Sequence, residues 1–278
     1  MRFKKVYVEI TNCCNFHCSF CYHSHRPATT VSPEVFSAIL SRLRPFTKYL
    51  YLHVLGEPLL HPQLPRLISM AVDMGFEVNI TTNGSLLSSR SDLPELNLVR
   101  QFNVSLHDGA ENVVEECQKD YFLSAFEFAH KHAEHSYISF RLWNQGADDV
   151  NEYNIRCLNS LQQYFKVTLP VDVLQKRNTK IADHIFLQNA ARFSWPGEAD
   201  NLAEEHTCYA LRDHIAVLSD GTVVPCCLDA DGQLALGNLL TDDLTKMLSS
   251  EKAKLLLNGF RNHRAVMPIC QHCGFKVG

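Results

Sequence analysis

Hydrophobic and polar positions repeat along the first two thirds of the chain with two periods in turn, that of a strand and that of a helix. Residues 5–10 alternate and are rich in β-branched side chains, which predicts a strand. Beyond a polar loop, Ser32 and Pro33 supply a helix start, and apolar residues recur at helical spacing from Val35 to Leu43. The same unit of strand, loop and helix then recurs. The further predicted strands are 49–55, 76–82, 99–106, 137–143 and 166–174, and the further predicted helices are 64–74, a short helix after strand 76–82, 113–135 and 150–164.

Six strands that alternate with helices predict an α/β fold with a parallel sheet, because parallel neighbours need crossover connections. The pattern breaks after the sixth strand. Residues 176–205 have the pattern of a loop and predict a connection between two domains, with aromatic side chains such as Trp195 folded back on the barrel. Beyond this segment, residues 214–218 and 222–225 alternate around a turn at Gly221, which predicts a β-hairpin.

Residues with chemical functions fall directly after the predicted strands. In a parallel barrel the C-terminal ends of the strands converge on one mouth, where catalytic loops collect. The sequence therefore predicts a functional site at this mouth. The strand-end segments are Cys14 to Cys21, Gly56-Glu57-Pro58, Thr82-Asn83-Gly84, Ser105 to Gly109 and Arg141 to Asn144.

Cys14, Cys18 and Cys21 have the spacing C-x3-C-x2-C. Three thiolates ligate three irons of a 4Fe–4S cluster and leave the fourth iron open to a ligand that is not protein. The alternatives are a structural zinc knuckle and a disulfide loop. Zinc sites prefer four ligands in C-x2–4-C pairs, and a chain that starts without an apolar signal segment is expected in the reducing cytoplasm. Both arguments favour the cluster.

A second set of cysteines lies near the C-terminus, where the predicted hairpin and a terminal C-x2-C loop bring four thiolates to one closed metal site. These are Cys208, Cys226, Cys270 and Cys273. A zinc ribbon is the alternative, but the N-terminal cluster motif and the softness of thiolate ligands favour iron and sulfur. Cys227 falls outside the pattern and is either a buried neighbour or an alternate ligand.

The composition describes a globular protein with a proper core, since 46% of the 278 residues are hydrophobic and 20% are charged. No apolar stretch is long enough to span a membrane. The net charge is −4 and the 26 Lys and Arg residues are spread along the chain, so there is no clear nucleic-acid footprint.

The cysteine spacing, with Phe20 directly before the third cysteine, resembles the cluster loop of the radical S-adenosylmethionine (SAM) enzymes. The resemblance implies a partial (β/α)6 TIM-like barrel and a 4Fe–4S cluster whose open iron binds SAM. The segment after the second strand is similar to the family's Gly-Gly-Glu-Pro motif, with Leu55 in place of the first glycine. It implies that Gly56 and Glu57 bind the amino group of SAM.

Roles are predicted for five further residues, four of them from the resemblance and His107 from its place beside the strand-end loops. Asn83 belongs to a Thr-Asn-Gly ending of the third strand that matches the family, and Ser105 is similar to a serine that binds the ribose hydroxyls. Arg141 and Asn144 are predicted carboxylate and ribose contacts. His107 is the predicted general base. In the simpler interpretation the Gly-Glu-Pro and Asn-Gly segments are ordinary turns, Ser105 caps a helix and Arg141 forms a structural ion pair.

The spacing C-x12-G-x4-C with a later C-x2-C resembles the SPASM type of C-terminal extension, which houses auxiliary 4Fe–4S clusters. Only five residues follow Cys273, so we expect the shortened twitch form with one auxiliary cluster. The predicted domains are 1–175 for the radical SAM core barrel, 176–207 for the connecting segment and 208–278 for the SPASM/twitch-like domain.

The resemblance implies an oxidoreductase that cleaves SAM reductively and abstracts a hydrogen atom from an unactivated C–H bond. A small molecule is the expected substrate, because the cluster loop begins at residue 14 and leaves no room for a leader-binding domain before it. The alternatives are a maturase that modifies a peptide or protein substrate, and a non-catalytic zinc-binding module. An external electron donor such as a flavodoxin or ferredoxin is the expected partner, with no membrane association.

Overall fold

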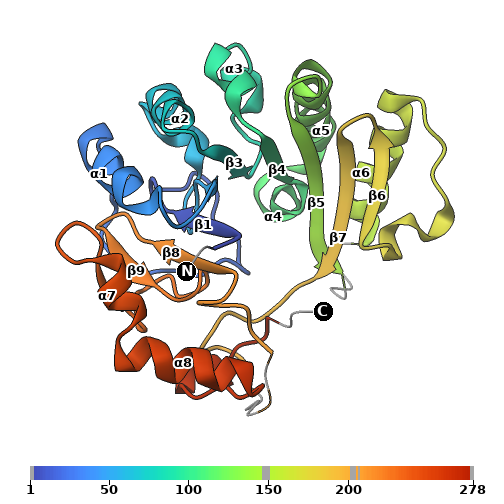
Figure 1. Cartoon of the computed structure of the whole chain (residues 1–278). Coiled ribbons are helices and arrows are strands. Elements are labelled where there is room, and N and C mark those ends of the chain that lie inside the picture. The colour runs from blue at the N-terminus through green and yellow to red at the C-terminus, as the bar shows by residue number, and fades with distance from the viewer. Residues whose placement is uncertain (1–2, 146–150, 201–204, 206, 276–278) are drawn as a thin grey trace.

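The computed structural model describes residues 3–145, 151–200, 205 and 207–275, and within this part of the chain ten strands form one sheet (Figure 1). Their order in the sheet is β10-β9-β8-β1-β2-β3-β4-β5-β7-β6. The strands are β1 Lys5–Val8, β2 Tyr49–Tyr51, β3 Glu77–Thr82, β4 Gln101–Ser105, β5 Tyr137–Gln145, β6 Asn178–Ala182, β7 Ile185–Ala191, β8 His214–Val217, β9 Thr222–Val224 and β10 Gly237–Asn238.

The central strands of the sheet, from β8 through β1 to β5 and β7, are all parallel. Antiparallel strands extend the sheet at both sides, with β6 next to β7 and with β9 and β10 beyond β8. The outer strands β10 and β6 do not pair with each other, so the described sheet curves into an open arc (Figure 1). The predicted partial barrel is confirmed.

Helices α1, α2, α3 and α5 lie along the outer side of this arc (Figure 1). The predicted start of the first helix is confirmed, since the Ser32 side chain accepts a hydrogen bond from the Val35 amide at 3.3 Å and Pro33 follows it. The helices are α1 Pro33–Leu43, α2 Leu64–Asp73, α3 Leu87–Arg90, α4 Gly109–Asn112, α5 Glu115–His132, α6 Asn151–Phe165, α7 Leu244–Leu248, α8 Glu251–Arg261 and α9 Pro268–Gln271.

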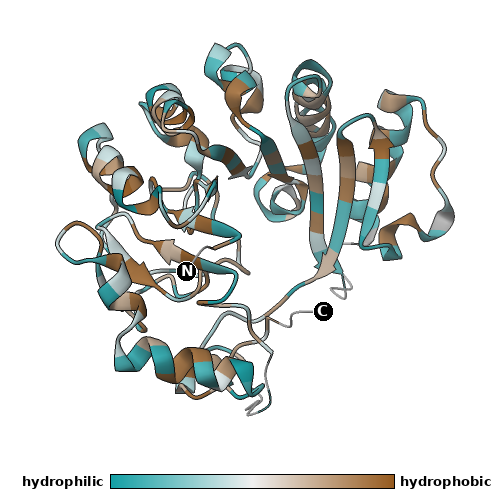
Figure 2. Ribbon diagram, in the orientation of Figure 1, coloured by the Kyte–Doolittle hydropathy of each residue, from teal (hydrophilic) through white to brown (hydrophobic). Residues whose placement is uncertain are grey.

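The register of the parallel strands separates an apolar outer face from a polar inner face. Successive side chains of a strand point to opposite faces, and residues paired in register share a face. Figure 2 shows the resulting hydrophobic and hydrophilic bands along β5. An outer row consists of Val6, Leu50 and Val78, which are fully buried in the core under the helices. The next inner row consists of Tyr7, Tyr51, Asn79, Gln101 and Tyr137.

The predicted sixth strand, 166–174, is wrong. This segment has no strand and contains the 3-10 turn Val171–Gln175. The sixth parallel strand is β7, which pairs with β5 and lies inside the segment 176–207 that the sequence indicates as a connection. The β6–β7 hairpin has no glycine at its turn, where His184 adopts a positive φ of 57°. The loop pattern therefore concealed two strands.

The C-terminal region joins the sheet directly, because β8 pairs in parallel with β1 from Lys5 opposite His214 to Val8 opposite Val217. The predicted hairpin of β8 and β9 is confirmed, with Gly221 at a φ of 88° in its turn. Helices α7 and α8 follow the hairpin and lie beside it at the open side of the arc (Figure 1). None of the helices in the described residues is long and apolar enough to cross a membrane.

Candidate active site and metal centres

The three N-terminal cysteines lie on the loop that leaves β1 at the mouth of the barrel. Cys14 is exposed, Cys21 is partly buried and Cys18 is buried. Burial raises the pKa of all three thiols, that of Cys21 to about 11. A bound metal deprotonates its thiol ligands outright, so loading of this loop releases protons.

Two side-chain amides point at the sulfurs of this loop. Asn112 Nδ2 on α4 donates to Cys18 Sγ at 3.1 Å, and Asn83 Nδ2 donates to Cys14 Sγ at 3.7 Å. Hydrogen bonds to ligand sulfurs orient the ligands of an iron–sulfur site and tune it. These donors fit a loop that holds a cluster through its thiolates.

Helix α4 holds the cluster loop, which the sequence alone did not indicate. Asn112 Oδ1 accepts from the His17 amide at 2.8 Å, and the Glu111 carboxylate accepts from the Ser19 amide at 2.6 Å and the Ser19 hydroxyl at 2.9 Å. The only signal was the position of both residues after strand β4. A short helix at the strand end therefore serves as a clamp on the loop.

The predicted connection also holds the cluster loop, as expected for its aromatic residues. Trp195 Nε1 donates to the carbonyl of Phe20 at 2.9 Å. The Arg192 guanidinium lies over the Phe20 ring, 4.5 Å from its centroid, and forms a 3.0 Å ion pair with Glu111. Phe20, the residue before the third cysteine, is thus held in place by Trp195 and Arg192 of the segment 176–207.

Gly56 and Glu57 pack directly against the start of the cluster loop. Gly56 has a φ of 78°, and the Glu57 amide donates to the carbonyl of Cys13 at 2.8 Å. The Glu57 carboxylate is buried and accepts from the amides of Leu59 at 2.9 Å and Asn83 at 2.7 Å. Burial raises the pKa of Glu57 to about 7, although these hydrogen bonds oppose the shift. The carboxylate joins the ends of β2 and β3.

Asn83 and Ser105 are brought to the same mouth, each at the end of its predicted strand. The Asn83 side chain reaches the cluster loop through Cys14 and Asn15, and its carbonyl accepts from the Tyr121 hydroxyl at 2.6 Å. Ser105 is buried and makes no capping hydrogen bond with its side chain. The interpretation of Ser105 as a helix cap is therefore wrong.

His107 is buried beside Phe20, with a distance of 5.5 Å between the ring centroids. Its Nδ1 lies 3.0 Å from the carbonyl of Arg141, and its Nε2 lies 3.2 Å from Asp108 Oδ1. Burial lowers the pKa of His107 to about 4 and raises the pKa of Asp108 well above its usual range. Burial thus favours the neutral imidazole of His107, whose Nδ1 donates to the carbonyl, and it favours the protonated form of Asp108.

Arg141 and Asn144 lie on opposite faces of β5. The Arg141 guanidinium stacks on Trp143, with its carbon 4.4 Å from the ring centroid, and has no ion pair among the described residues. The interpretation of Arg141 as part of a structural ion pair is therefore wrong. Asn144 is fully buried, and both ends of its amide pair with Asn154 of α6 at 2.9 and 3.0 Å. The structure does not bring Asn144 to the mouth, because this residue faces the helix layer.

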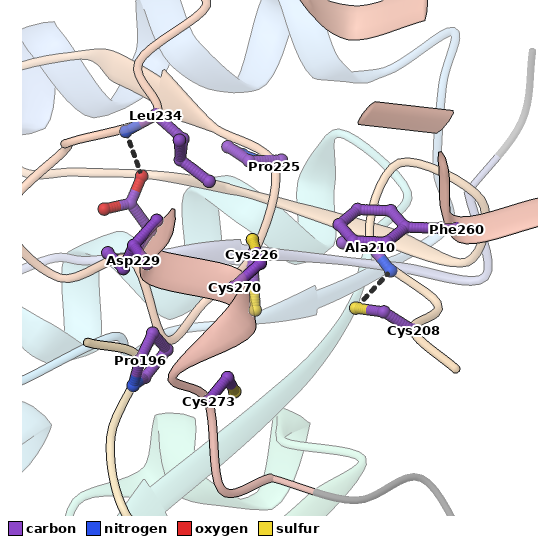
Figure 3. A pocket seen from close by; sticks show the side chains of 11 residues that line it. Pro196, Cys208, Ala210, Pro225, Cys226, Asp229, Leu234, Phe260, Cys270 and Cys273 are labelled. Carbon is purple, nitrogen blue, oxygen red and sulfur yellow. Dashed lines mark hydrogen bonds between the residues drawn. The ribbon is translucent and has the colours of Figure 1, made fainter. Parts of the chain in front are cut away.

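The four C-terminal cysteines line one pocket (Figure 3). Cys226 and Cys270 lie at the centre of this view, with Cys208 to their right and Cys273 below them. Apart from the Asp229 carboxylate, the wall is largely apolar, with Leu234, Phe260 and Pro225 among its members. Burial raises the pKa of the Cys208 thiol to about 12 and that of Cys270 further. An apolar wall with four thiols fits an iron–sulfur cluster whose ligands are all protein.

The spacing of these sulfurs does not fit a single zinc ion. Zinc with Zn–S bonds of about 2.3 Å holds its four sulfurs about 3.8 Å apart. Within the described ranges, no three of the four cysteines have sulfurs within 4.8 Å of one another. The geometry disfavours the zinc ribbon alternative.

Cys227 does not line this pocket, although its Sγ lies within 4.8 Å of the Cys226 Sγ and of a ring nitrogen of His214. It packs with Tyr7 and Val54 against a small apolar cluster of Ala216, Leu218 and Val224. Of the two adjacent cysteines, only Cys226 lines the pocket. The interpretation of Cys227 as a buried neighbour fits this placement.

Glu9 connects the two cysteine regions, and its role was not visible in the sequence. Its buried carboxylate accepts from Arg26 at 2.7 and 2.8 Å and from the amide of Ser219 in the hairpin turn at 3.1 Å. Arg26 follows the cluster loop, so one carboxylate joins this loop to the C-terminal hairpin. The only sequence signal was an acidic residue at the end of a predicted strand.

These elements define an enzyme with an iron–sulfur loop at a barrel mouth, and comparison with known families agrees. The chain belongs to the radical SAM superfamily, whose sequence model matches residues 8–139. Its C-terminal region is an iron–sulfur cluster-binding domain of the SPASM type, matched over residues 208–274. The two matches imply SAM, a 4Fe–4S cluster that binds it and auxiliary iron–sulfur ligation.

Individual relatives match only parts of the chain in sequence. One is a tungsten-containing aldehyde ferredoxin oxidoreductase cofactor-modifying protein of Pyrococcus furiosus, 31% identical over 118 residues that make up 40% of this chain and 33% of that protein. The chain spans about a third of the length of the curated relatives that it matches.

Solved structures share the fold over nearly the whole chain. The structure of BtrN in complex with AdoMet and 2-DOIA has a TM-score of 0.64 at 17% identity, and the match covers 99% of this chain and 94% of that one. Streptococcus suis SuiB bound to the precursor peptide SuiA has a TM-score of 0.58 at 16% identity, covering 99% and 70%.

Proposed function

We propose that this radical SAM enzyme is an oxidoreductase that removes a hydrogen atom from an unactivated C–H bond of a small molecule. The observation that carries the proposal is the position of β1. This strand ends in the three-cysteine loop and pairs with β8, the first strand of the four-cysteine region. Both cysteine sets therefore adjoin one barrel interior.

We assign the SAM-binding cluster to Cys14, Cys18 and Cys21. The single auxiliary cluster belongs to Cys208, Cys226, Cys270 and Cys273. When bound, these groups supply reductive cleavage of SAM, hydrogen-atom abstraction and an acceptor for the second electron of the oxidation. The described chain supplies the thiolates, the amides of Asn83 and Asn112 that point at two of them, and the apolar wall of the second pocket.

The residues at the barrel mouth position SAM. Glu57 is a positioning residue, because its buried carboxylate holds the amides of Leu59 and Asn83 and so fixes the backbone around Gly56. Ser105, whose hydroxyl caps no helix, offers this group to the ribose of SAM. Asn144 is not part of this proposal, since Asn154 occupies its amide.

His107 is the proposed general base. Its lowered pKa keeps the imidazole neutral at pH 7, which is the form that accepts a proton. The nitrogen that gains the proton is Nε2, which faces Asp108.

A peptide substrate is the second candidate, and the SuiB complex with its precursor peptide supports it. Such a substrate would enter at the same barrel mouth. An external donor such as a flavodoxin or ferredoxin supplies the electrons. Free thiol ligands require a reducing compartment, so we propose the cytoplasm as the location.

The test is anaerobic reconstitution followed by iron and sulfide counts and a SAM cleavage assay with a strong reductant. We expect about eight irons per chain, as two 4Fe–4S clusters require, and formation of 5′-deoxyadenosine. Zinc in place of iron after anaerobic purification would contradict the auxiliary cluster. Iron-loaded protein that leaves SAM intact would contradict the activity.

A further inference from the structure

Four polar atoms on the inner face of the barrel are buried and have no hydrogen-bond partner within the described ranges. They are His53 Nδ1, Ser139 Oγ, Arg141 Nε and His214 Nε2. The strand register places all four residues on the inner face. On β5, Ser139 and Arg141 lie two and four residues after the inner-row Tyr137. His53 lies two residues after the inner-row Tyr51, and His214 pairs with Lys5, which lies two residues before Tyr7. Buried polar groups are normally satisfied, so four on one face indicate a missing partner.

The same face carries two cations, Lys5 and Arg141, that form no ion pair with a carboxylate in the described part of the chain. Lys5 Nζ lies 5.2 Å from the ring centroid of Tyr7 and 5.3 Å from that of Tyr51. Neither its ammonium nor the Arg141 guanidinium has a carboxylate within 4.0 Å in the described part of the chain. Burial lowers the pKa of Lys5, and it lowers that of Arg141 to about 10.

The carboxylates that could neutralise this face are already engaged. Glu9 pairs with Arg26, and Glu77 pairs with Lys48 at 2.9 Å. Asp108 Oδ1 lies 3.2 Å from His107 Nε2, and burial raises the pKa of Asp108. An ionised Cys227 thiol would attract Lys5, but it is not among the charges that act on Arg141. The inner face therefore keeps an excess of positive charge.

A hollow of about 200 Å³ opens on this face at Ser139, and neither Lys5 nor Arg141 is among the residues that line it. Its wall contains Ser139 and also Gln188, which pairs in register with Arg141. The Tyr7 and Tyr51 rings, whose centroids are 5.2 Å apart, lie on the same face next to Lys5. The inner face thus combines room, aromatic surface and hydrogen-bond donors.

We propose that the inner face of the barrel binds an anionic group of the substrate, a carboxylate or a phosphate, between Lys5 and Arg141. The proposal rests on the proposed function and names its substrate class, a small anionic molecule. The oxyanion accepts from the guanidinium and the ammonium, which satisfies both cations at once. The two tyrosine rings pack against the remaining part of the substrate.

In this proposal Arg141 binds the substrate and not the carboxylate of SAM, which the sequence predicted as its partner. The groups that raise the pKa of Arg141 are Tyr7, Tyr51 and Asp108, and the two tyrosines lie on the strands below the mouth. The cysteine loop begins only after β1 has ended. A single carboxylate of SAM at the mouth would leave Lys5 without a partner.

The test measures anion binding to the reconstituted holoenzyme with saturating SAM under anaerobic conditions. The probes are inorganic phosphate and benzoate, compared with chloride at equal ionic strength and with neutral benzamide. Calorimetry gives the affinity, and a melting-temperature shift gives a second measure. We expect phosphate or benzoate to bind and benzamide to bind more weakly. Tighter binding of phosphate would indicate a phosphate group on the substrate, and tighter binding of benzoate would indicate a carboxylate.

The variants are Lys5→Met and Arg141→Met, with Lys4→Met as the matched control. Lys4 is adjacent in sequence, but its side chain is 75% exposed and pairs with Asp213 at 2.8 Å. Each inner-face variant should weaken binding of the anion by about tenfold or more, the usual effect of losing a charged hydrogen bond. Lys4→Met should not. Lys5→Arg keeps the charge and should restore binding, which separates loss of the site from loss of the fold.

Three outcomes would overturn the proposal. The first is that neither anion binds the wild-type holoenzyme. The second is equal weakening by Lys4→Met and Lys5→Met. The third is that Lys5→Met weakens SAM as much as it weakens the anion, which would assign the cations to SAM. A holoenzyme that binds phosphate but does not cleave SAM would contradict the proposed function and leave the anion site standing.

Discussion

Gly56 lies so close to Thr11 that a β-carbon on Gly56 would stand 2.4 Å from the Thr11 carbonyl oxygen. Real β-carbons do not approach backbone oxygens to this distance, so any side chain at position 56 must push the cluster loop away. The positive φ of 78° adds backbone strain for a residue other than glycine.

Gly56→Ala should therefore destabilise the fold by about 3 kcal/mol and lower iron retention in the N-terminal loop. Gly232→Ala is the matched control, because Gly232 has a φ of 72° but its nearest neighbour would be 3.4 Å from the β-carbon. It should cost only about 1 kcal/mol, from the left-handed backbone alone. Urea unfolding and iron counts measure both variants. Equal effects of the two substitutions would show that the clash with Thr11 is unimportant.

The N-terminal cysteines are predicted to account for all SAM cleavage. Replacing Cys14, Cys18 and Cys21 together with alanine should abolish 5′-deoxyadenosine formation and leave about four irons, those of one 4Fe–4S cluster. Cys117→Ala is the control, because Cys117 is exposed on α5 and belongs to neither set. Continued SAM cleavage by the triple variant would disprove the assignment.

Cys226 and Cys227 should behave differently although they are adjacent. Cys226→Ala removes a sulfur from the four-cysteine pocket, so it should lower the melting temperature and abolish product formation while SAM is still cleaved without substrate. Cys227→Ala should leave the cluster in place, because this side chain packs with Tyr7 outside the pocket. Iron counts decide the matter, and cluster loss only in the Cys227 variant would reverse the assignment.

Glu57 gives a pH dependence whose sign follows from its burial. Its pKa is about 7 in the folded chain against an ordinary value of 4.5, so the folded state keeps the proton longer as pH rises. The free energy of unfolding therefore falls between about pH 4.5 and 7, by at most about 1.4 kcal/mol per pH unit from this group.

Glu57→Gln lacks this titration, so wild type should lose about 2 kcal/mol relative to the variant between pH 5 and pH 7. Anaerobic urea unfolding at both pH values measures the difference. Glu116→Gln, on the exposed side of α5, is the control and should show no such trend. A pH-independent difference would mean that Glu57 ionises normally in the fold.

Most of the barrel follows from its hydrophobic periods, because each strand and helix of the first half has its own apolar face. The exception is β7, since segment 166–174 also alternates in sequence and precedes it. The turn before β7 depends on His184 in a left-handed conformation, for which a sequence offers no glycine signal. Tertiary pairing with β5, not local preference, decides which segment becomes the strand.

The sequence predicts the parts of the site that a motif of fixed spacing marks, such as the cysteines. It does not predict contacts between residues far apart in the chain. Cysteine spacing indicates candidate ligands, but the contacts of Glu111 and Asn112 with the cluster loop join residues more than ninety positions apart. Asn144 was misplaced because a residue near a strand end can face either layer. The face of β5 to which Asn144 points, relative to Arg141, depends on the irregular register of β5 after Leu142.

Glu9 forms an ion pair with Arg26 and accepts a hydrogen bond from the Ser219 amide, so the fold around β1 is completed only late in synthesis of the chain. Glu9 and Ser219 are 210 residues apart, so the first strand leaves the ribosome long before its partner β8. At roughly 5–20 residues per second, β1 waits about 10–40 s with one edge unpaired. During that interval the edge can pair with other nascent chains. The enzyme thus depends on β8, a strand made late in synthesis, and on whatever shields β1 until then, to avoid aggregation before any iron is inserted.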